Sequence, residues 1–451
     1  MNVAVIGTGY VGLTTGVALA HLCHMVTCVD TDEAKLQALQ AGRIPIFEPF
    51  LESVLASSRT HLCFTASYAD AIPSADVVFI AVGTPSLADG NSDMQFVRAA
   101  AQSVGEHLGQ GFTVIVNKST VPIGSGNWVE SLVHDALEAR GFTADFAIAS
   151  NPEFLREGSA LHDSFFPDRI VVGSDHERAV AMLEELYGAI VAQTFVPPVG
   201  LPRLSEQKPV PFVRADLASA ELIKYAANAF LALKISFINE MAELGEKVGA
   251  NVQTVARGIG LDARIGEQFL QAGIGWGGSC FGKDTAALIA TAREYGLSMP
   301  IVAAAREVNA QARARIIEHL LAELKILKGR TIGLLGLAFK PDTDDLRDSP
   351  ALEIARRLIE RGARVRVHDP VALERLKLEY PALGVLPFVD ACALAQDADA
   401  LVLVTKWPEY LALPWEDVVA SMRNPLIIDG RNVLDRKRLE TAGARLIGVG
   451  Q

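Results

Sequence analysis

The sequence predicts an α/β protein in which two doubly wound parallel-sheet domains are joined by a long central helix. Apolar strands alternate with helical stretches over roughly the first 200 residues, and the same alternation returns from about residue 330. Between them lies an unbroken helical pattern of about 30 residues. Such alternation is typical of βαβ units in a parallel sheet. A chain of 451 residues, 50% of them hydrophobic, has room for two or three domains.

The charge and cysteine content exclude several classes of protein. A net charge of -12 argues against a nucleic-acid partner but leaves room for a small anionic ligand in a locally positive pocket. No apolar run reaches the ~18 residues of a membrane span, and the first residues enter a strand without a basic, cleavable leader. Five scattered cysteines do not form a disulfide framework. We therefore expect a cytoplasmic protein without a membrane partner, in a compartment that keeps thiols reduced.

The first strand, residues 2–6, runs into Gly-x-Gly-x-x-Gly at Gly7, Gly9 and Gly12 and then into a helix. Gly7 permits the tight turn, Gly9 lets a pyrophosphate reach the backbone, and Gly12 packs helix on strand. The next strand ends at Asp30, where a carboxylate binds the ribose and would repel a 2'-phosphate. The pattern predicts a Rossmann-like domain that prefers NAD to NADP. The alternative is a tight strand–helix turn without a ligand.

Four metal-ligand residue types lie close together near the N-terminus: His21, Cys23, His24 and Cys28. They fall at the end of the first helix and inside the second strand, where side chains diverge. No second ligand pair follows at zinc spacing, so we predict no metal site.

Two further buried strands end in small polar turns. One is followed by Gly-Thr-Pro at residues 83–85, and the other by Lys-Ser-Thr at residues 118–120. Ligands bind at the carboxyl ends of parallel strands, so Thr120 is a candidate site residue. The alternative is that its hydroxyl caps a helix.

The segment 151–158 follows another short strand and carries two carboxylates four residues apart, Glu153 and Glu157. On a helix they would share a face and repel each other, a cost that is avoided unless one of them is engaged. Strands predicted at 168–173 and 191–196 extend this domain to about residue 200. The proline-rich stretch 197–214 that follows is predicted to be an irregular surface loop.

The long helix begins at about residue 216 and spans ~45 Å at 1.5 Å per residue, longer than a small domain is wide. We expect it to run between domains. Lys224 and Asn228 lie four residues apart on one face, in an apolar and alanine-rich neighbourhood. The alternative is a snorkelling lysine beside a surface asparagine.

A glycine-rich loop at residues 273–284 surrounds Cys280, and Asp284 follows four residues later. The loop has little side-chain bulk, so backbone and ligand can approach closely. A helix predicted over 285–293 places Cys280 near a helix N-terminus, where the positive end of the dipole favours a thiolate. The loop is typical of a nucleophile. The alternative is a small buried thiol.

After a helical pattern over 300–327, a second alternation of strands and helices begins without the three-glycine turn, so we predict a Rossmann-like domain with another ligand. Basic residues follow its strands, which suits phosphate binding, although a solvated basic rim is the alternative. These residues are Lys340, beside Phe339, and Arg347 after the first strand, and Arg431 after the last. The predicted strands are 330–336, 364–369, 400–405 and 425–431.

These motifs together resemble the UDP-glucose 6-dehydrogenase family, within the wider group of nucleotide-sugar dehydrogenases. The resemblance covers nearly the whole chain. The proline-rich stretch 197–214 is a departure, because it is longer than the family's connection, and it leaves the nearby substrate contacts open. The motifs are Gly-x-Gly-x-x-Gly from Gly7, Val-Gly-Thr-Pro from Val82, Ser-Thr-Val-Pro from Ser119, Asn-Pro-Glu-Phe-Leu-Arg-Glu-Gly from Asn151, Glu-Leu-Ile-Lys-Tyr-Ala-Ala-Asn-Ala from Glu221, Gly-Gly-Ser-Cys-Phe-Gly-Lys-Asp from Gly277 and Leu-Ala-Phe-Lys from Leu337.

The resemblance implies a four-electron oxidation in which a sugar C6 alcohol becomes a carboxylate and two NAD are reduced in turn. Lys224 and Asn228, with a water held by Thr120 and Asp284, would stabilise the alkoxide and accept its proton. Cys280 would then attack the bound aldehyde to give a thiohemiacetal and, after the second oxidation, a thioester.

The resemblance also implies which residue completes the reaction and which residues bind NAD and the UDP-sugar. Glu153 would activate the hydrolytic water while Lys224 holds the oxyanion. The implied NAD contacts are Gly7, Gly9, Tyr10, Val11, Gly12, Asp30, Lys35, Gly83, Thr84, Pro85, Thr120, Glu157, Lys283 and Arg347. The implied UDP-sugar contacts are Glu153, Phe154, Leu155, Arg156, Glu157, Lys224, Asn228, Arg264, Phe269, Gly273, Gly277, Cys280, Phe339, Lys340 and Arg431.

The implied organisation is an NAD-binding domain over 1–200, the loop over 201–215, a central helical domain over 216–325 that carries the cysteine loop, and a UDP-sugar-binding domain over 326–451. The long helix resembles the family's dimer core, so we expect a homodimer or higher homo-oligomer. Arg264 is then expected to reach a neighbouring subunit's site.

Two kinds of alternative remain. UDP-N-acetylmannosamine or GDP-mannose dehydrogenase would keep the chemistry and change the sugar, although Arg264-Ile-Gly before Phe269, and Trp276-Gly-Gly-Ser-Cys280, are more similar to the UDP-glucose members. A non-catalytic NAD-binding regulator on the same fold predicts loss of the catalytic set, whereas that set is complete in this sequence.

Overall fold

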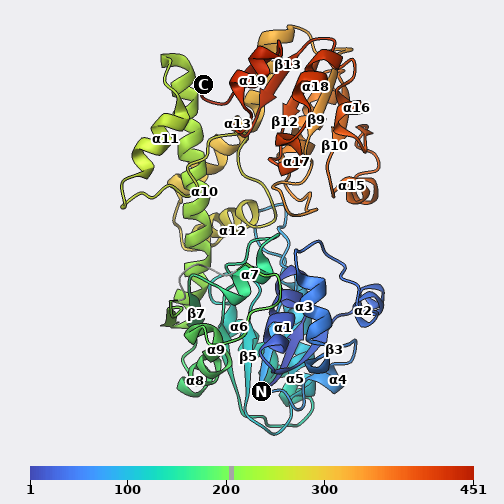
Figure 1. Ribbon diagram of the computed structural model, residues 1–451. Coiled ribbons are helices and arrows are strands. Elements are labelled where there is room, and N and C mark those ends of the chain that lie inside the picture. Colours follow the sequence, from blue (N-terminus) through green and yellow to red (C-terminus); the bar gives the residue numbers. More distant parts are fainter. Residues whose placement is uncertain (203–207) are drawn as a thin grey trace. The chain divides into compact units, whose positions relative to one another are not determined.

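Two mainly parallel sheets organise the chain, one in each of two units of the computed structural model, which describes residues 1–202 and 208–451 (Figure 1). Unit 1 comprises residues 1–227 and 286–296, and unit 2 comprises 228–285 and 297–451. The predicted α/β class with two parallel-sheet domains is confirmed. The segment 216–325, expected to be a separate helical domain, is shared between the two units.

The sheet of unit 1 has the order β3-β2-β1-β4-β5-β6-β7-β8, in which β6 and β7 pair antiparallel and the other neighbours pair parallel. Its strands are β1 (Asn2–Ile6), β2 (Met25–Val29), β3 (Leu62–Thr65), β4 (Val77–Ile80), β5 (Thr113–Asn117), β6 (Phe146–Ser150), β7 (Ile170–Gly173) and β8 (Phe212–Ala215). The first six follow the order 3-2-1-4-5-6 that dinucleotide-binding folds use.

Helices cover both faces of this sheet. One core cluster joins Leu13 and Val17 of α1 to Leu51 of α3, and the other joins Val97 of α5 to Val129 of α6. The helices are α1 (Tyr10–His21), α2 (Glu33–Gln40), α3 (Leu51–Ser57), α4 (Tyr68–Ala71), α5 (Gln95–His107), α6 (Ser125–Ala139), α7 (Ala160–Phe165), α8 (Glu177–Leu186) and α9 (Gly188–Ala192), with a short 3-10 helix at Arg59–His61. Strands buried on both faces read as continuous apolar runs, which explains why β4 and β5 are evident in the sequence.

Two sequence predictions in this unit are wrong. The strand predicted at 191–196 is absent among the described residues; instead α9 ends at Ala192 and Gln193 turns the chain with a φ of 52°. A short apolar run does not distinguish strand from helix by its period, and burial of Ile190 favours the helix here. The last part of the stretch expected to be irregular forms β8, which pairs with β7. Residues 203–207 of that stretch lie outside the described residues.

Unit 2 contains a sheet of six parallel strands in the order β11-β10-β9-β12-β13-β14, again 3-2-1-4-5-6. Its strands are β9 (Thr331–Leu335), β10 (Arg364–His368), β11 (Leu386–Pro387), β12 (Ala400–Leu403), β13 (Leu426–Asp429) and β14 (Arg445–Gly448). Its helices are α11 (Val252–Gly260), α13 (Pro300–Leu324), α14 (Pro350–Glu360), α15 (Leu373–Glu379), α16 (Ala391–Ala395), α17 (Pro408–Leu411), α18 (Trp415–Ser421) and α19 (Arg436–Thr441).

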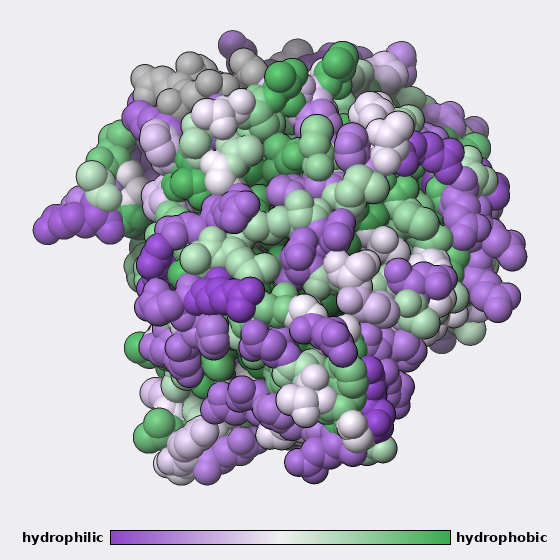
Figure 2. All heavy atoms as spheres, turned by 90° about the horizontal axis from the view of Figure 1, so that it is seen from below, coloured by the Kyte–Doolittle hydropathy of each residue, from purple (hydrophilic) through white to green (hydrophobic). Residues whose placement is uncertain are grey.

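Two helices belong to both units. The predicted long helix is α10 (Leu217–Val248), of 32 residues, and the helix predicted after the cysteine loop is α12 (Phe281–Glu294). Within the described part of the chain, no helix is long and apolar enough to cross a membrane. Figure 2 shows one face of the molecule, on which hydrophilic and hydrophobic residues are interspersed.

Candidate active site

The Gly-x-Gly-x-x-Gly turn joins β1 to α1 and has the geometry that a bound dinucleotide needs. Gly7 has a φ of +98°, and a Cβ there would lie 2.6 Å from the carbonyl oxygen of Ala81. A Cβ at Gly12 would lie 1.9 Å from the carbonyl oxygen of Gly7. By contrast, a Cβ at Gly9 would meet no atom of the described chain within 4 Å, so protein packing does not require this glycine. The space over Gly9 therefore suits a pyrophosphate.

Asp30 follows β2 at the edge of this turn. Its Oδ2 accepts a hydrogen bond from the Thr8 amide at 2.8 Å and another from the Thr8 hydroxyl, and its Oδ1 accepts from the Asp32 amide at 3.0 Å. Burial alone would raise the pKa of Asp30, but these hydrogen bonds outweigh it and hold the pKa below its usual value. The half-buried carboxylate is charged, as hydrogen bonding to a ribose requires.

The equivalent acid of unit 2 is occupied by the protein itself. Asp369 follows β10, is buried, and accepts hydrogen bonds from the amides of Leu337 and Ala338 at 2.7 and 3.0 Å. The indole of Trp407 donates to the same oxygen at 3.2 Å. Asp369 is thus held by protein donors, and the turn after β9 lacks the three glycines of the turn after β1.

The loops after β4 and β5 meet, as their position at the carboxyl edge predicts. The Thr84 hydroxyl donates to the carbonyl of Thr120 at 2.9 Å. The alternative in which Thr120 caps α6 is wrong, because the N-cap of that helix is Gly124. The amides of Gly124 and Gly126 donate instead to the carboxylate of Glu221 on α10, at 2.6 and 2.9 Å. Burial raises the pKa of Glu221 to about 7.

A buried ion pair joins Glu153 to Lys224. The Lys224 Nζ lies 2.8 Å from Glu153 Oε1, and the amide of Leu155 donates to Glu153 Oε2 at 2.7 Å. Burial opposes ionisation, but the charge of Lys224 keeps the pKa of Glu153 below its usual value. The ring of Phe154 has the Arg169 guanidinium 3.6 Å from its centre and the Lys224 ammonium 5.5 Å from it.

Residues 151–158 form a loop rather than a helix. Glu153 and Glu157 therefore do not share a helix face, and the repulsion considered for them does not arise; Glu153 is engaged by Lys224 instead. In the same loop, Arg156 points its guanidinium to Asp163, with a shortest separation of 2.6 Å.

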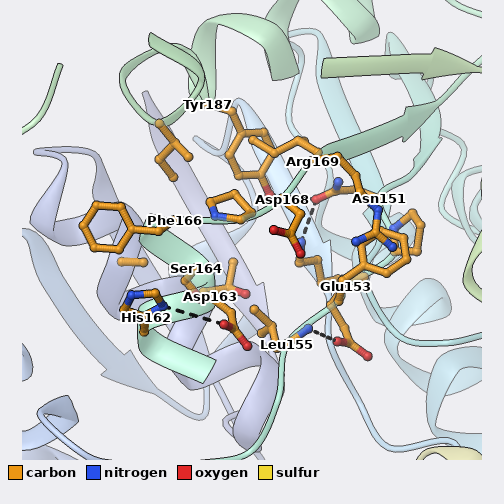
Figure 3. A pocket seen from close by; sticks show the side chains of 18 of the residues that line it. Asn151, Glu153, Leu155, His162, Asp163, Ser164, Phe166, Asp168, Arg169 and Tyr187 are labelled. Carbon is orange, nitrogen blue, oxygen red and sulfur yellow. Dashed lines mark hydrogen bonds and ion pairs between the residues drawn. The ribbon is translucent and has the colours of Figure 1, made fainter. Parts of the chain in front are cut away.

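The sequence analysis missed three residues beside this pair: Lys118, Asn151 and Tyr187. They line a cavity of about 170 Å³ together with Glu153 (Figure 3). The Lys118 ammonium donates to Asn151 Oδ1 at 2.8 Å, and the Tyr187 hydroxyl donates to the same oxygen at 2.7 Å. Lys118 directly follows β5, so the rule that ligands bind at the carboxyl ends of parallel strands, which selected Thr120, also applied to Lys118. Tyr187 follows α8 and carried no such signal.

In unit 2, Asn228 and Asp284 form a second buried pair. The Asn228 Nδ2 donates to Asp284 Oδ2 at 2.6 Å, and Lys283 Nζ lies 2.7 Å from Asp284 Oδ1. The exposed fraction of Asp284 is 1%, so its carboxylate is almost closed to solvent and is contacted by these two neighbours. The alternatives in which Lys224 and Asn228 are surface residues are wrong, because both are buried.

Cys280 immediately precedes α12, as predicted. Its carbonyl accepts from the amide of Asp284 at 2.8 Å, which starts the helix, and its Sγ lies 3.6 Å from the Ser279 hydroxyl. The side chain is half-buried. By contrast, Cys28 is fully buried, and burial raises its pKa to about 12. The buried-thiol alternative therefore describes Cys28 better than Cys280.

The glycines of the cysteine loop serve packing within unit 2. A Cβ at Gly275 would lie 2.3 Å from Asn309 Oδ1, and one at Gly277 would lie 2.4 Å from the Asp348 carbonyl. The side chain of Asn309 on α13 also bonds the backbone of Trp276: its Oδ1 accepts from the Trp276 amide at 2.7 Å and its Nδ2 donates to the Trp276 carbonyl at 3.0 Å. At these two glycines the close approach is made by protein atoms.

A larger cavity of about 700 Å³ lies in unit 2, a volume that fits a nucleotide sugar. Burial lowers the pKa of Arg431 to about 10, and its Nε donates to the Val404 carbonyl at 2.6 Å. The predicted residues that line the cavity are Phe269, Gly277, Phe339, Lys340 and Arg431; Arg257 and Lys406 line it without having been predicted. Lys406 follows β12, so its position at the carboxyl end of a strand could have identified it. Arg257 lies on α11 and had no such signal.

Other predicted residues lie elsewhere. Gly273 and Arg264 are not among the residues that line this cavity in the described chain, and the side chain of Arg264 is 88% exposed beside Asp262. Arg347 binds the buried carboxylate of Asp345, 2.8 Å away. Lys35 lies in the first turn of α2, 4.0 Å from Asp32.

Two of the four residues considered for a metal, His21 and His24, bond to backbone carbonyls. His21 bonds the carbonyl of Val196 at 2.7 Å, and His24 bonds that of Leu186 at 3.2 Å. Residues 1–202 and 208–451 contain no group of three or more His, Cys, Asp or Glu that could hold a metal ion.

Comparison with known proteins assigns the chain to a family. The UDP-glucose/GDP-mannose dehydrogenase models match its NAD binding domain at residues 1–191, its central domain at 218–311 and its UDP binding domain at 333–436. The chain belongs to the UDP-glucose/GDP-mannose dehydrogenase family. It is therefore an NAD-dependent oxidoreductase, and the resemblance, the enzyme class and the cofactor predicted from the sequence are confirmed.

Full-length relatives support this assignment. UDP-glucose 6-dehydrogenase TuaD of Bacillus subtilis is 44% identical, with 100% of this chain and 93% of TuaD covered. The UDP-glucose 6-dehydrogenase of Rhizobium meliloti is 44% identical, with 100% of both chains covered. The solved structure of a UDP-glucose dehydrogenase from Pyrobaculum islandicum is 40% identical, with a TM-score of 0.88 over 99% of this chain and 97% of the other.

Proposed function

We propose that this dehydrogenase oxidises UDP-glucose to UDP-glucuronate through a thioester on Cys280. The observation that carries the proposal is on α10: Lys224 and Asn228, one turn apart, each pair with a different buried carboxylate, Glu153 and Asp284. Charged and amide donors that remain buried and paired are suited to stabilising an oxyanion. The printed names of the full-length relatives support UDP-glucose as the substrate.

The first oxidation removes a hydride from C6 and a proton from its hydroxyl group. Lys224 and Asn228 stabilise the developing alkoxide, and a water held by Thr120 and Asp284 accepts the hydroxyl proton. NAD, held by the glycine turn and Asp30, supplies the hydride acceptor when bound. Both the space over Gly9 and the ionised Asp30 fit this cofactor.

The second oxidation uses the thiol. The Cys280 sulfur forms a bond to C6 of the bound aldehyde while its S–H bond breaks, and the thiol proton passes to the aldehyde oxygen. The resulting thiohemiacetal loses a second hydride and that proton to become a thioester. Glu153 takes a proton from water, which attacks the thioester carbon while Lys224 holds the oxyanion. The C–S bond then breaks, the sulfur takes the proton from Glu153 to return the thiol, and the uronate is released.

The UDP group belongs in the cavity of unit 2. Lys340 and Arg431, at the carboxyl edge of its sheet, supply positive charge for the diphosphate, and Arg257 and Lys406 add to it. Phe269 and Phe339 offer apolar surface for the uracil. UDP-N-acetylmannosamine and GDP-mannose remain the alternative substrates. A non-catalytic NAD-binding regulator is disfavoured because the catalytic side chains are complete.

We also propose a homodimer through α10. Phe230, Phe237 and Leu244 recur at seven-residue spacing on this helix and are 62%, 44% and 55% exposed. Large apolar side chains in a heptad stripe are typical of a helix–helix interface. In such a dimer the exposed Arg264 is available to a neighbouring subunit's site.

The proposed function is tested by incubating the purified protein with NAD and each of the three nucleotide sugars. We expect two NADH and one uronate for each UDP-glucose consumed, without free aldehyde, measured by absorbance and by mass of the product. One NADH per sugar would contradict the thioester route. Turnover of another sugar alone would change the substrate, and no turnover with any sugar would favour the regulator.

A further inference from the structure

Lys118 is a buried cation that the reaction as described leaves without a role. Its exposed fraction is 9%, and its ammonium donates to Asn151 Oδ1 at 2.8 Å. The orientation of that amide is set from both ends, because Asn151 Nδ2 donates to the carbonyl of Val171 at 2.7 Å and the Tyr187 hydroxyl donates to Oδ1 at 2.7 Å. The Tyr187 ring also has the Lys118 ammonium 5.8 Å from its centre. Lys118 is therefore held by neutral groups.

The carboxylate of Glu153 lies in the same cavity as the ammonium of Lys118. Lys118 and Glu153 both line it, and each acts on the charge of the other: Glu153 favours the ammonium, and Lys118 favours the carboxylate. Lys224 completes a cluster of two ammonium groups and one carboxylate. One positive charge is thus in excess while Lys224 and Glu153 remain paired.

We infer that Lys118 is a positioning residue that supplies a second positive charge to Glu153, so that this carboxylate stays ionised when Lys224 turns from it to the substrate oxyanion. The inference rests on the proposed function, in which Lys224 and Glu153 work on different atoms in the same step. A buried carboxylate that loses its cation takes up a proton, and a protonated Glu153 cannot act as a base. Because its hydrogen bond goes to Asn151, Lys118 stays in place when Lys224 moves.

Other charged groups near the cluster already have neighbours of their own. Arg156 pairs with Asp163, and His162 lies 3.8 Å from the same carboxylate. Asp168 favours the charge of Arg169, whose guanidinium stacks on Phe154. The positive charges that lower the pKa of Glu153 are those of Lys224 and Lys118.

The charge of Lys118 is itself sensitive to pH. Burial, reinforced by the charge of Lys224, lowers its pKa to about 8. Below that pH the ammonium supports Glu153, and above it the support is lost as the proton leaves. Because this support is needed where Glu153 would otherwise take up a proton, Lys118 should act on the acid limb of thioester hydrolysis, at pH values where Lys118 itself is charged.

The test is single-turnover uronate formation as a function of pH, by rapid quench, in the full-length protein and its variants. In Lys118→Met we expect the acid limb of hydrolysis to move up by about one pH unit, which is roughly a tenfold loss on that limb, with NAD affinity unchanged. Tyr187→Phe removes a hydrogen bond from the same Asn151 oxygen without removing charge and should lose less than about threefold. Lys118→Arg keeps a positive charge at this position and should retain the acid limb of the wild type.

Three outcomes would overturn the inference: a Lys118→Met profile that overlies the wild type, a Tyr187→Phe profile equal to that of Lys118→Met, or a Lys118→Arg profile whose acid limb moves as far as that of Lys118→Met. If Lys118→Met does not fold, Lys118→Gln, a second variant without the charge, takes its place. Failure of the proposed function is distinct, because the wild type itself would then form no uronate.

Discussion

The ammonium of Lys224 lies 2.8 Å from the carboxylate of Glu153, and both side chains are buried. In the proposed reaction this pair must separate during hydrolysis, since Lys224 holds an oxyanion while Glu153 activates water. Before the reaction, the ion pair therefore keeps the ammonium of Lys224 and the carboxylate of Glu153 in the charged forms that their proposed roles require.

Glu153→Gln should slow thioester hydrolysis more than hydride transfer. The amide cannot take a proton from water, and general-base catalysis typically contributes 10²–10⁴-fold. We expect the first NADH to form at near the wild-type rate and a covalent enzyme–sugar adduct to accumulate, seen by intact mass. A spectrum without adduct during turnover would assign the base to another residue.

Cys280→Ala should abolish net uronate formation. The first oxidation is uphill and reversible when no thiol captures the aldehyde, so little NADH should accumulate. Cys392→Ala, a change at another half-buried cysteine, is the matched control and should behave as wild type. Uronate formation by Cys280→Ala at near the wild-type rate, measured by mass, would rule out the covalent route.

Asp30→Ala should weaken NAD binding by about ten- to a hundredfold and narrow the preference for NAD over NADP, because a charge-assisted hydrogen bond is worth about 1.5–3 kcal/mol. Glu33→Ala removes an exposed carboxylate three residues away and is the control. Dissociation constants from calorimetry check both changes. An unchanged affinity would remove Asp30 from the cofactor site.

Glu221→Gln should change how stability depends on pH. Because burial raises the pKa of Glu221 to about 7, the folded protein binds more protons than the unfolded chain between about pH 4.5 and 7. The contribution of this group to the free energy of unfolding is full below the lower value and is lost as the pH rises through about 7, by about 1–3 kcal/mol.

Melting temperatures of wild type and Glu221→Gln from pH 5 to 8 measure this effect. The wild type should lose more stability than the variant across that range. The variant itself leaves one of the two amides, Gly124 or Gly126, with a poorer acceptor, so its absolute stability should also fall. Parallel pH curves for the two proteins would refute the assignment.

Phe237→Glu should dissociate the proposed dimer, because it places charge in the centre of the apolar stripe on α10. Leu378→Glu on α15, where the leucine is 81% exposed outside that stripe, is the matched control and should keep the wild-type mass. Light scattering after gel filtration measures the mass of each. A wild-type protein that is monomeric, or a Phe237→Glu variant that remains a dimer, would contradict the interface.

The sequence by itself determined the features that depend on local chain chemistry. Short-range periodicity and backbone preference predict the glycine turn, the strand ends near Asp30 and Thr120, the long helix, and the position of Cys280 before a helix. It did less well where a short apolar run was ambiguous, as at 191–196, because burial of Ile190 by the rest of the fold decided for a helix.

The tertiary structure decided which side chains meet. Asn151 accepts from Lys118, 33 residues earlier in the chain, and from Tyr187, 36 residues later, and Asp369 accepts from the indole of Trp407. No local pattern encodes such contacts, since they depend on strand order and on which loops share an edge of the sheet. The charge state of Lys118, Glu153 and Glu221 depends on the burial and the neighbours that this folding brings together.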